Sequence, residues 1–156
     1  TLDAAKESQK QSFIFLLEGM LDEILDKPES AMQSYLQVEM PSLRHKALKR
    51  ALTHFMNTKN YEQSMLVLEQ LCSFSLEYMV PYSDMLNMMG QKISAAQILQ
   101  MYLTQHPEHY AIQNKMAQLL MDLGETEAVL ATANFVLENE PTDKTALHIK
   151  QELSIV

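Results

Sequence analysis

Residues 90–141 of this chain read GQKISAAQILQMYLTQHPEHYAIQNKMAQLLMDLGETEAVLATANFVLENEP. Gly90 and Gly124 are 34 residues apart, as are Pro107 and Pro141, and each Pro follows its Gly by 17 residues. Glycine closes a helix in the left-handed conformation without a Cβ clash, whereas proline stops a helix because it has no N–H to donate. The stretch therefore predicts two copies of one unit, made of a helix, a turn, a second helix and a stop.

Residues 10–40 carry a less regular pair of helical patterns. Apolar residues recur at helical spacing on both sides of Pro28, which breaks the run, and the second stretch stops at Pro41. Residues 1–10 are polar, and we expect them to be frayed. This part of the chain is predicted to be a divergent helical hairpin.

Residues 42–75 form the next predicted hairpin. Asn60 has capping-box spacing with Gln63 at the start of its second helix, and Lys59 stands just before it in the turn. If Lys59 is equivalent to Gly90, the two turns are 31 residues apart, three fewer than the period. The repeat register therefore slips between these two units.

The 34-residue pattern places two further hairpins at residues 78–106 and 109–140. After Pro141, Thr142 is expected to cap a last amphipathic helix over residues 142–154. Such a helix covers the apolar end of a stack of repeats. No alternating β-branched run competes with these helical patterns, so the sequence predicts an all-α protein.

A 34-residue unit with these landmarks resembles the tetratricopeptide repeat, in which each repeat is a pair of antiparallel helices. The resemblance covers roughly residues 42–154 and rests on the period and the landmarks rather than on consensus side chains. It implies an αα-hairpin solenoid of about four hairpins plus a C-terminal capping helix. The whole of residues 1–156 is expected to form a single helical-repeat domain.

A narrower resemblance rests on a short stretch that contains Asn60-Tyr61-Glu62, Leu71-Cys72 and the aromatic residues Phe74 and Tyr78. It is similar to the first repeat of the class II type III secretion chaperones. These are small acidic tetratricopeptide proteins, and the resemblance implies an N-terminal helical region used in self-association. It also implies a concave groove that holds an extended segment of a translocator protein.

The composition argues against several classes of function. A net charge of −8 and a pI near 5.0 argue against nucleic acid as the main partner, because neutralising phosphates needs a basic surface. With only three Gly residues, the sequence contains neither a P-loop nor a dinucleotide-binding fingerprint. We expect no enzymatic activity and no cofactor.

Two features could suggest site chemistry, and each has a simpler interpretation. His106 and His109 flank Pro107-Glu108, which is interpreted as a polar loop between repeats rather than a metal site. Cys72 lies on an apolar helical face and is interpreted as a small core residue rather than a reactive thiol. We therefore predict no metal site.

Charge is unevenly distributed along the chain. Residues 41–107 carry a net charge of +2 between two flanking segments of −5 each. Lys46, Lys49 and Arg50 are spaced so that all three lie on one helical face. Aligning the repeats on their turns places that face in the groove, where it could pair with an acidic segment; a solvated polar face is the alternative.

The same alignment gives the full set of predicted partner-binding residues. They are Lys46, Lys49, Arg50, Thr53, Met56, Asn57, Asn87, Met88, Asn114, Lys115, Gln118 and Met121. Met56, Met88 and Met121 recur at nearly equivalent positions in three repeats. Flexible thioethers suit a groove that accepts an extended apolar segment, and the filling of core gaps is the alternative.

The first predicted helix carries an apolar stripe of Phe13, Leu17, Met20 and Ile24. If this stripe is exposed in the isolated protein, it favours a structural scaffold subunit of a larger complex, for example a secretion or assembly machinery. It also allows a homodimer through residues 10–40.

From these observations we expect a non-enzymatic protein-binding module. It is a chaperone or adaptor that holds an extended segment of a partner in a concave groove, with the scaffold role as the alternative. The longest uninterrupted apolar run, Phe13–Leu17, is far shorter than the roughly 20 residues that cross a bilayer. A soluble protein is expected, and the cytoplasm is the favoured compartment.

Overall fold

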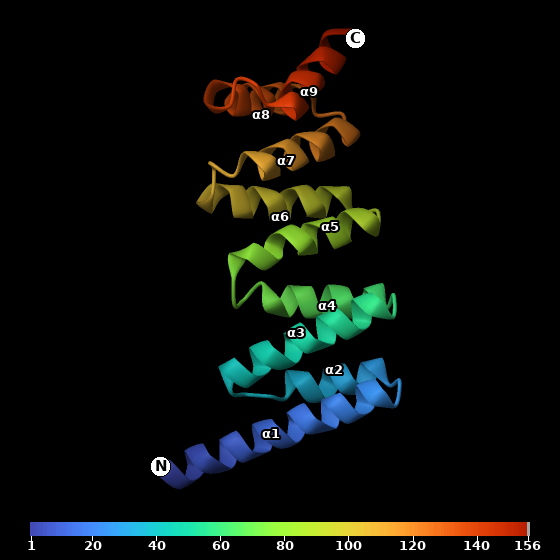
Figure 1. The fold of residues 1–156 in the computed structure, drawn as a ribbon, viewed down its shortest axis with the longest axis vertical. Coiled ribbons are helices and arrows are strands. Elements are labelled where there is room, and N and C mark those ends of the chain that lie inside the picture. The colour runs from blue at the N-terminus through green and yellow to red at the C-terminus, as the bar shows by residue number, and fades with distance from the viewer. Residues whose placement is uncertain (156) are drawn as a thin grey trace. The chain divides into compact units, whose positions relative to one another are not determined.

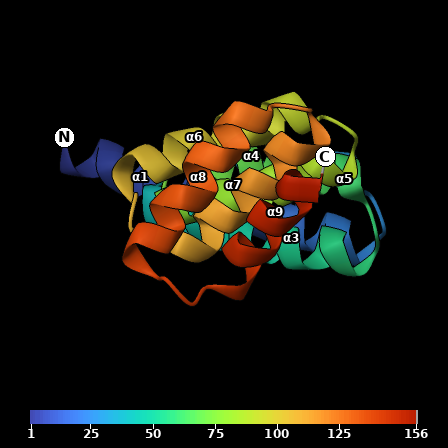
Figure 2. The ribbon, with the colours of Figure 1, turned by 90° about the horizontal axis from the view of Figure 1, so that it is seen from above.

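The regular structure of this protein is helical (Figures 1 and 2). The computed structural model describes residues 1–155, apart from the side chain of Ile155, and no strand occurs in that part of the chain. The prediction of an all-α fold is therefore confirmed. The chain divides into two compact units, Thr1–Tyr78 and Met79 onward, which are called unit 1 and unit 2 below.

Unit 1 consists of two helical hairpins that pack against each other. Its elements are α1 (Leu2–Ile24), α2 (Pro28–Leu36), α3 (Pro41–Asn57), α4 (Tyr61–Leu71) and a 3-10 turn at Leu76–Tyr78. Apolar faces of α2, α3 and α4 form one core cluster, against which Leu16 and Met20 of α1 also pack. The cluster consists of Ala31, Met32, Tyr35, Ala47, Leu48, Ala51, Phe55, Val67 and Leu71.

Two boundaries in unit 1 differ from the sequence-based expectations. Residues 1–10 are not frayed, because α1 begins at Leu2 and the Thr1 hydroxyl accepts the N–H of Ala4 at 3.2 Å. Pro41 does not end α2, which stops at Leu36, but begins α3 instead. Proline suits a first helical turn, since the N–H that it lacks would have no partner there.

Unit 2 consists of two further hairpins and a last helix. Its elements are α5 (Met79–Met88), α6 (Lys92–Gln105), α7 (Tyr110–Asp122), α8 (Thr126–Asn139) and α9 (Lys144–Ile155). α9 packs against α8 and α7 and covers their apolar side. The cluster beneath it consists of Ala117, Val129, Ala133, Val136, Ala146 and Ile149. Asp143, and not Thr142 as predicted, caps α9, because its Oδ1 accepts the N–H of Ala146 at 2.8 Å.

All four hairpins are closed by the same turn. One residue in each turn is left-handed: Asp26 (φ 55°), Lys59 (φ 58°), Gly90 (φ 79°) and Gly124 (φ 76°). In each turn this residue donates its N–H to the carbonyl three residues back, and the next residue donates to the carbonyl five residues back, over 2.8–3.1 Å. These two bonds pair carbonyls that the helix end leaves free. The predicted equivalence of Lys59 and Gly90 is confirmed, and Asp26 is a fourth equivalent position.

Lys59→Gly is expected to raise the free energy of unfolding by about 0.5–1 kcal/mol, because a left-handed residue with a side chain is strained where glycine is not. The matched change Gly124→Ala introduces that strain at the equivalent turn and is expected to lower the free energy of unfolding by about 1 kcal/mol. Urea unfolding followed by circular dichroism measures both. A Lys59→Gly variant no more stable than wild type would contradict the expectation.

α1 lies close to α2 at Gly19. A Cβ at this position would overlap the ring of Tyr35, whose side chain is fully buried. The absence of a side chain at Gly19 therefore lets the two helices of the first hairpin pack together. This glycine is required for its small size and not for its backbone conformation.

Gly19→Ala is expected to lower the free energy of unfolding by about 1–3 kcal/mol, the usual penalty for overpacking a core. Alanine is the better helix former by roughly 1 kcal/mol, so a net loss shows that the overlap with Tyr35 dominates. Thermal unfolding measures the change. The control is Glu18→Ala on the exposed side of the same helix, which is expected to stay within about 0.5 kcal/mol of wild type.

Candidate functional site

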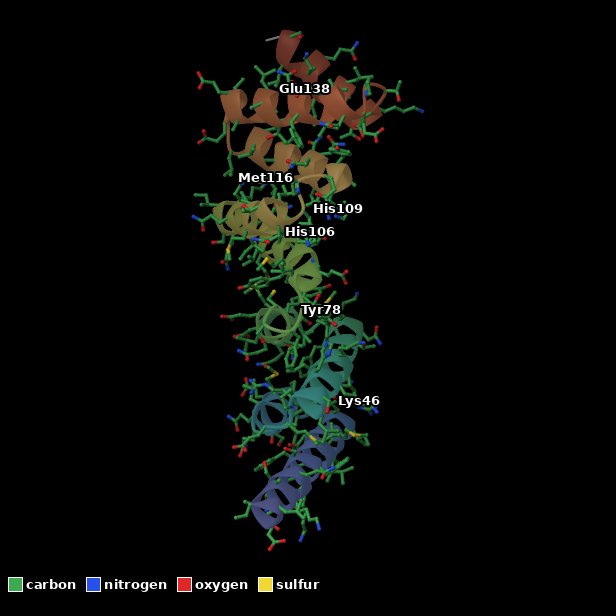
Figure 3. All side chains as sticks on the ribbon, turned by 90° about the vertical axis from the view of Figure 1, so that its left-hand side faces the viewer. Lys46, Tyr78, His106, His109, Met116 and Glu138 are labelled. Carbon is green, nitrogen blue, oxygen red and sulfur yellow. The ribbon has the colours of Figure 1, made fainter. Side chains whose placement is uncertain are left out.

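The predicted partner-binding residues of unit 1 lie together on the outer side of α3, which we call the α3 face. It consists of Lys46, Lys49, Arg50, Thr53, Met56 and Asn57, all of them exposed. Figure 3 shows Lys46 on the outside of this helix. Within the described part of the chain, neither Lys46 nor Lys49 forms an ion pair, so both ammonium groups are available to a partner.

Arg50 differs from its neighbours on the α3 face because it has a partner inside unit 1. Its Nε lies 3.4 Å from Oε2 of Glu23, whose side chain is 5% exposed, against 48% for Arg50. The hydroxyl of Tyr35 donates a hydrogen bond to the other carboxylate oxygen of Glu23. A buried carboxylate needs such partners, because water no longer solvates it. Arg50 therefore links α3 to α1 and has a structural role.

Burial raises the pKa of Tyr35 far above its ordinary value. The hydrogen bond to Glu23 and the negative charge of that carboxylate raise the pKa further, whereas the nearby Arg50 lowers it. The phenol consequently stays protonated in the folded protein, and it keeps donating its hydrogen bond to Glu23.

Three of the six predicted partner-binding residues of unit 2 line one groove, and the other three do not. A groove of about 480 Å³ runs along α7 and the start of α9, and we call it the α7 groove. Its lining consists of Ala111, Asn114, Lys115, Gln118, Asp143 and Thr145. Three predicted residues, Asn114, Lys115 and Gln118, are thus brought together. The other three are not, because Asn87 and Met88 are exposed on α5 and Met121 packs against the core of unit 2.

Asn114 is the most buried polar residue of the α7 groove, with 7% of its surface exposed. Its Nδ2 donates to Oδ1 of Asp143 at 2.9 Å, and the same oxygen caps α9. This bond fixes which way the amide points, because the opposite orientation would set two oxygens against each other. The Oδ1 of Asn114 is buried and has no hydrogen-bond partner.

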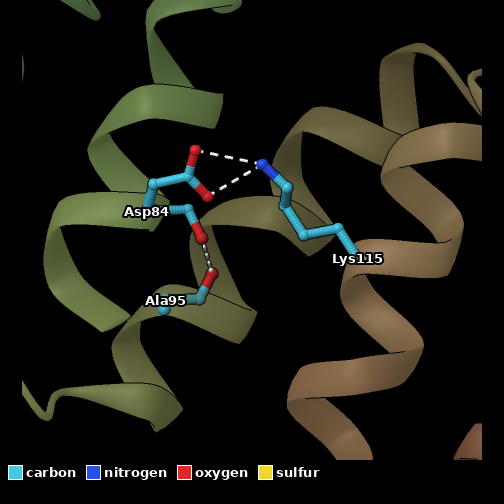
Figure 4. Close-up of polar contacts among 4 residues, drawn as sticks. Asp84, Ala95 and Lys115 are labelled. Carbon is cyan, nitrogen blue, oxygen red and sulfur yellow. Dashed lines mark hydrogen bonds and ion pairs between the residues drawn. The ribbon is translucent and has the colours of Figure 1, made fainter. Parts of the chain in front are cut away.

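Lys115 extends from α7 to a carboxylate on α5. Its Nζ lies 2.9 Å from Oδ1 and 3.0 Å from Oδ2 of Asp84 (Figure 4). Both side chains are partly solvated, with 38% and 50% of their surfaces exposed. An exposed pair of this kind contributes only about 0–1 kcal/mol, so Lys115 can exchange Asp84 for another carboxylate at little cost.

Asp143 and Thr145 are lining residues that the sequence did not predict. Both lie just after Pro141, at the beginning of α9. The signal that could have found them is the stop at Pro141, since the residues that follow it start a helix against α7. The contact between Asp143 and Asn114 brings together residues 29 apart in the sequence.

His106 and His109 have local structural partners, and Cys72 is partly buried. His109 and Tyr102 are joined by a hydrogen bond of 2.7 Å between Nδ1 and Oη, and His106 lies near them (Figure 3). Burial raises the pKa of the Cys72 thiol, and the charge of Glu69 adds to this effect. Among the described residues, no three His, Cys, Asp or Glu side chains are grouped as metal ligands would be. None of the helices described is both long and apolar enough to span a bilayer.

No family model matches this sequence, and no curated protein matches it. Solved structures do match its fold. A tetratricopeptide repeat protein from Parabacteroides merdae ATCC 43184 is 13% identical, with a TM-score of 0.65, over 92% of this chain and 59% of that one. The tetratricopeptide domain of P58(IPK) is 14% identical, with a TM-score of 0.65, over 92% of this chain and 45% of that one.

A third similar structure is YrrB, a tetratricopeptide protein with an unusual peptide-binding site. It is 15% identical, with a TM-score of 0.58, over 98% of this chain and 90% of that one. At these identities the likeness concerns the fold. The protein is therefore an all-α helical-repeat protein with the tetratricopeptide fold. Four hairpins and a last helix are the arrangement that the sequence predicted, and the 34-residue period contributed the last two hairpins.

The free energy of unfolding is expected to fall as the pH rises above about 10, the pKa of tyrosine in an unfolded chain. Tyr35 ionises there in the unfolded state but stays protonated in the folded state, so the unfolded state is favoured. The Tyr35→Phe variant lacks this proton. Its free energy of unfolding should therefore decrease less steeply with pH than that of wild type. The two slopes should differ by up to about 1.4 kcal/mol per pH unit in urea unfolding at about pH 9–11. Equal slopes for the two proteins would contradict the raised pKa of Tyr35.

Proposed function

We propose that this protein is a non-enzymatic chaperone or adaptor that holds an extended segment of a partner protein, and that the α7 groove is one place of contact. The observation that carries the proposal is the groove itself. It brings the amides of Asn114 and Gln118 and the ammonium of Lys115 to one lining. These are the side-chain types that pair with a peptide backbone and with a carboxylate.

The chemistry of the α7 groove suits an extended backbone. An extended chain offers N–H and C=O groups in alternation, and the two side-chain amides can both donate and accept. The unpaired Oδ1 of Asn114 is a buried acceptor, which costs roughly 1–3 kcal/mol. Lys115 and Asp143 add one charge of each sign at the rim.

The α3 face offers a second contact of different chemistry. Lys46 and Lys49 supply two positive charges, and Met56, which is 41% exposed, supplies an adaptable apolar surface beside them. We infer that a segment bound here carries acidic side chains next to an apolar one. Arg50 is excluded from this role because it already pairs with Glu23.

The similarity to YrrB supports the proposal at the level of the fold, since that protein is described as having an unusual peptide-binding site. A helical-repeat scaffold exposes helix faces along which an extended segment can lie. The identity of the segment depends on the side chains of this chain, which differ from those of YrrB at most positions.

The test is the selection of short peptides from a phage-displayed random library on the wild-type protein, followed by fluorescence anisotropy with the enriched peptides. Gln118→Ala and Lys115→Ala are each expected to weaken binding about tenfold, equivalent to about 1.4 kcal/mol, because each removes one polar contact. Asn114 is left unchanged because its bond to Asp143 supports α9. The matched control is Gln100→Ala on the exposed side of α6, which should bind as wild type does.

A second arm uses the double variant Lys46→Glu, Lys49→Glu with Arg50 intact. Peptides that carry acidic residues should lose affinity for this variant, and the loss should shrink at high salt because exposed charges are screened. The proposal is wrong if the enriched peptides bind every one of these variants, in the α7 groove and on the α3 face alike, as tightly as they bind wild type. Binding would then take place elsewhere.

A further inference from the structure

α1 packs one side against unit 1 and leaves the opposite side exposed. One side, with Ser12, Gly19 and Glu23, is buried within unit 1. The other side carries five exposed apolar side chains, and Leu25, the residue that caps the end of α1, adds a sixth. We call this set the α1 stripe: Phe13, Ile14, Leu17, Leu21, Ile24 and Leu25. Leu17 is 61% exposed and Ile24 is 76% exposed. Met20, which the sequence placed in this stripe, packs instead against the core of unit 1.

The α1 stripe is continuous and uncharged. At 100° per residue its six members fall on one side of the helix, directly opposite Gly19, and no charged residue lies between them. Soluble proteins rarely expose an apolar strip of more than a few hundred Å² without a partner. By contrast, the outer side of α9 carries Lys144, His148, Gln151 and Glu152, and Leu147 is the one large apolar side chain exposed among those described there.

The stripe is also symmetric about one residue. Its members lie six, five and two positions before Gly19 and two, five and six positions after it. A two-fold axis perpendicular to α1 at the level of Gly19 therefore maps the stripe onto itself. Such self-complementarity is what a closed two-fold interface requires, whereas a stripe that fits a different protein has no reason to possess it.

We propose that α1 pairs with α1 of a second copy of this chain, antiparallel, about a two-fold axis that passes opposite Gly19. Leu17 then faces Leu21 of the second copy, Ile14 faces Ile24, and Phe13 faces Leu25. The 3-4-3 spacing of Ile14, Leu17, Leu21 and Ile24 is the spacing with which two helices interlock side chains along a seam. A single helix per copy gives an interface at the small end of the specific range, so the dimer dissociates on dilution.

The first experiment is sedimentation equilibrium over a range of concentrations. The apparent molecular mass of the wild-type protein should increase from 17.9 kDa towards twice that value as its concentration rises. The double variant Leu17→Asp, Ile24→Asp should stay monomeric while keeping wild-type helicity by circular dichroism, because both side chains are exposed in the isolated chain. Leu147→Asp on α9 is the control, and its dimerisation should equal that of wild type.

Two results of that experiment would overturn the proposal. If wild type stays monomeric at all concentrations, the stripe is covered by another protein, as in the scaffold role. If the double variant dimerises as wild type does, the interface lies elsewhere. Because neither variant touches the α7 groove, these results are independent of peptide binding.

The second experiment tests the antiparallel orientation with cysteines. Cys72 is the single cysteine, so Cys72→Ser provides a background in which Ile14→Cys and Ile24→Cys are each introduced alone. In an antiparallel pair the two copies of residue 14 lie about 15 Å apart along the axis, too far for a disulfide, whereas residue 14 faces residue 24. Mild oxidation should therefore join the two variants when mixed and leave each variant alone unlinked. Rapid linking of each variant to itself would show a parallel pair and refute the two-fold arrangement.

Discussion

The architecture depends on one local constraint, the left-handed residue that ends the first helix of each hairpin. Two hydrogen bonds close every turn in the same way, and the chain reverses within a few residues. Because the turn is so short, the two helices lie antiparallel and their apolar faces meet, which is how the core clusters of both units form. Glycine adopts the left-handed conformation without strain at two turns, whereas Asp26 and Lys59 adopt it at a cost in free energy because they carry a Cβ.

Polar residues on the helix faces serve folding as well as recognition. Arg50 and Asn114 look like binding residues in the sequence, yet one partners the buried Glu23 and the other the cap of α9. Lys115 is intermediate, because its exposed pair with Asp84 is weak enough to be exchanged. The residues available to a partner are therefore those whose side chains are exposed and contribute least to contacts within the fold, such as Lys46, Lys49 and Gln118.

The first and the last helix described here differ in chemistry. α9 buries Ala146 and Ile149 and turns charged and polar groups to solvent, as a capping helix should. α1 buries one face beside Tyr35 and leaves the symmetric α1 stripe on the other. A capping role thus suits α9, whereas α1 has an exposed apolar face that the described part of the chain does not cover.

The sequence by itself determined the helical class, the four hairpins, the equivalence of Lys59 with Gly90 and the Asn60 cap, because helical period and turn chemistry act over a few neighbouring residues. It also placed Asn114, Lys115 and Gln118 on one face of a helix. Only the tertiary structure decided that Asp143 and Thr145 join them, that Arg50 is bound to Glu23, and that Met20 is packed while Leu21 is exposed. These outcomes depend on which helix lies opposite, and contacts between residues distant in the chain leave no periodic signal in the sequence.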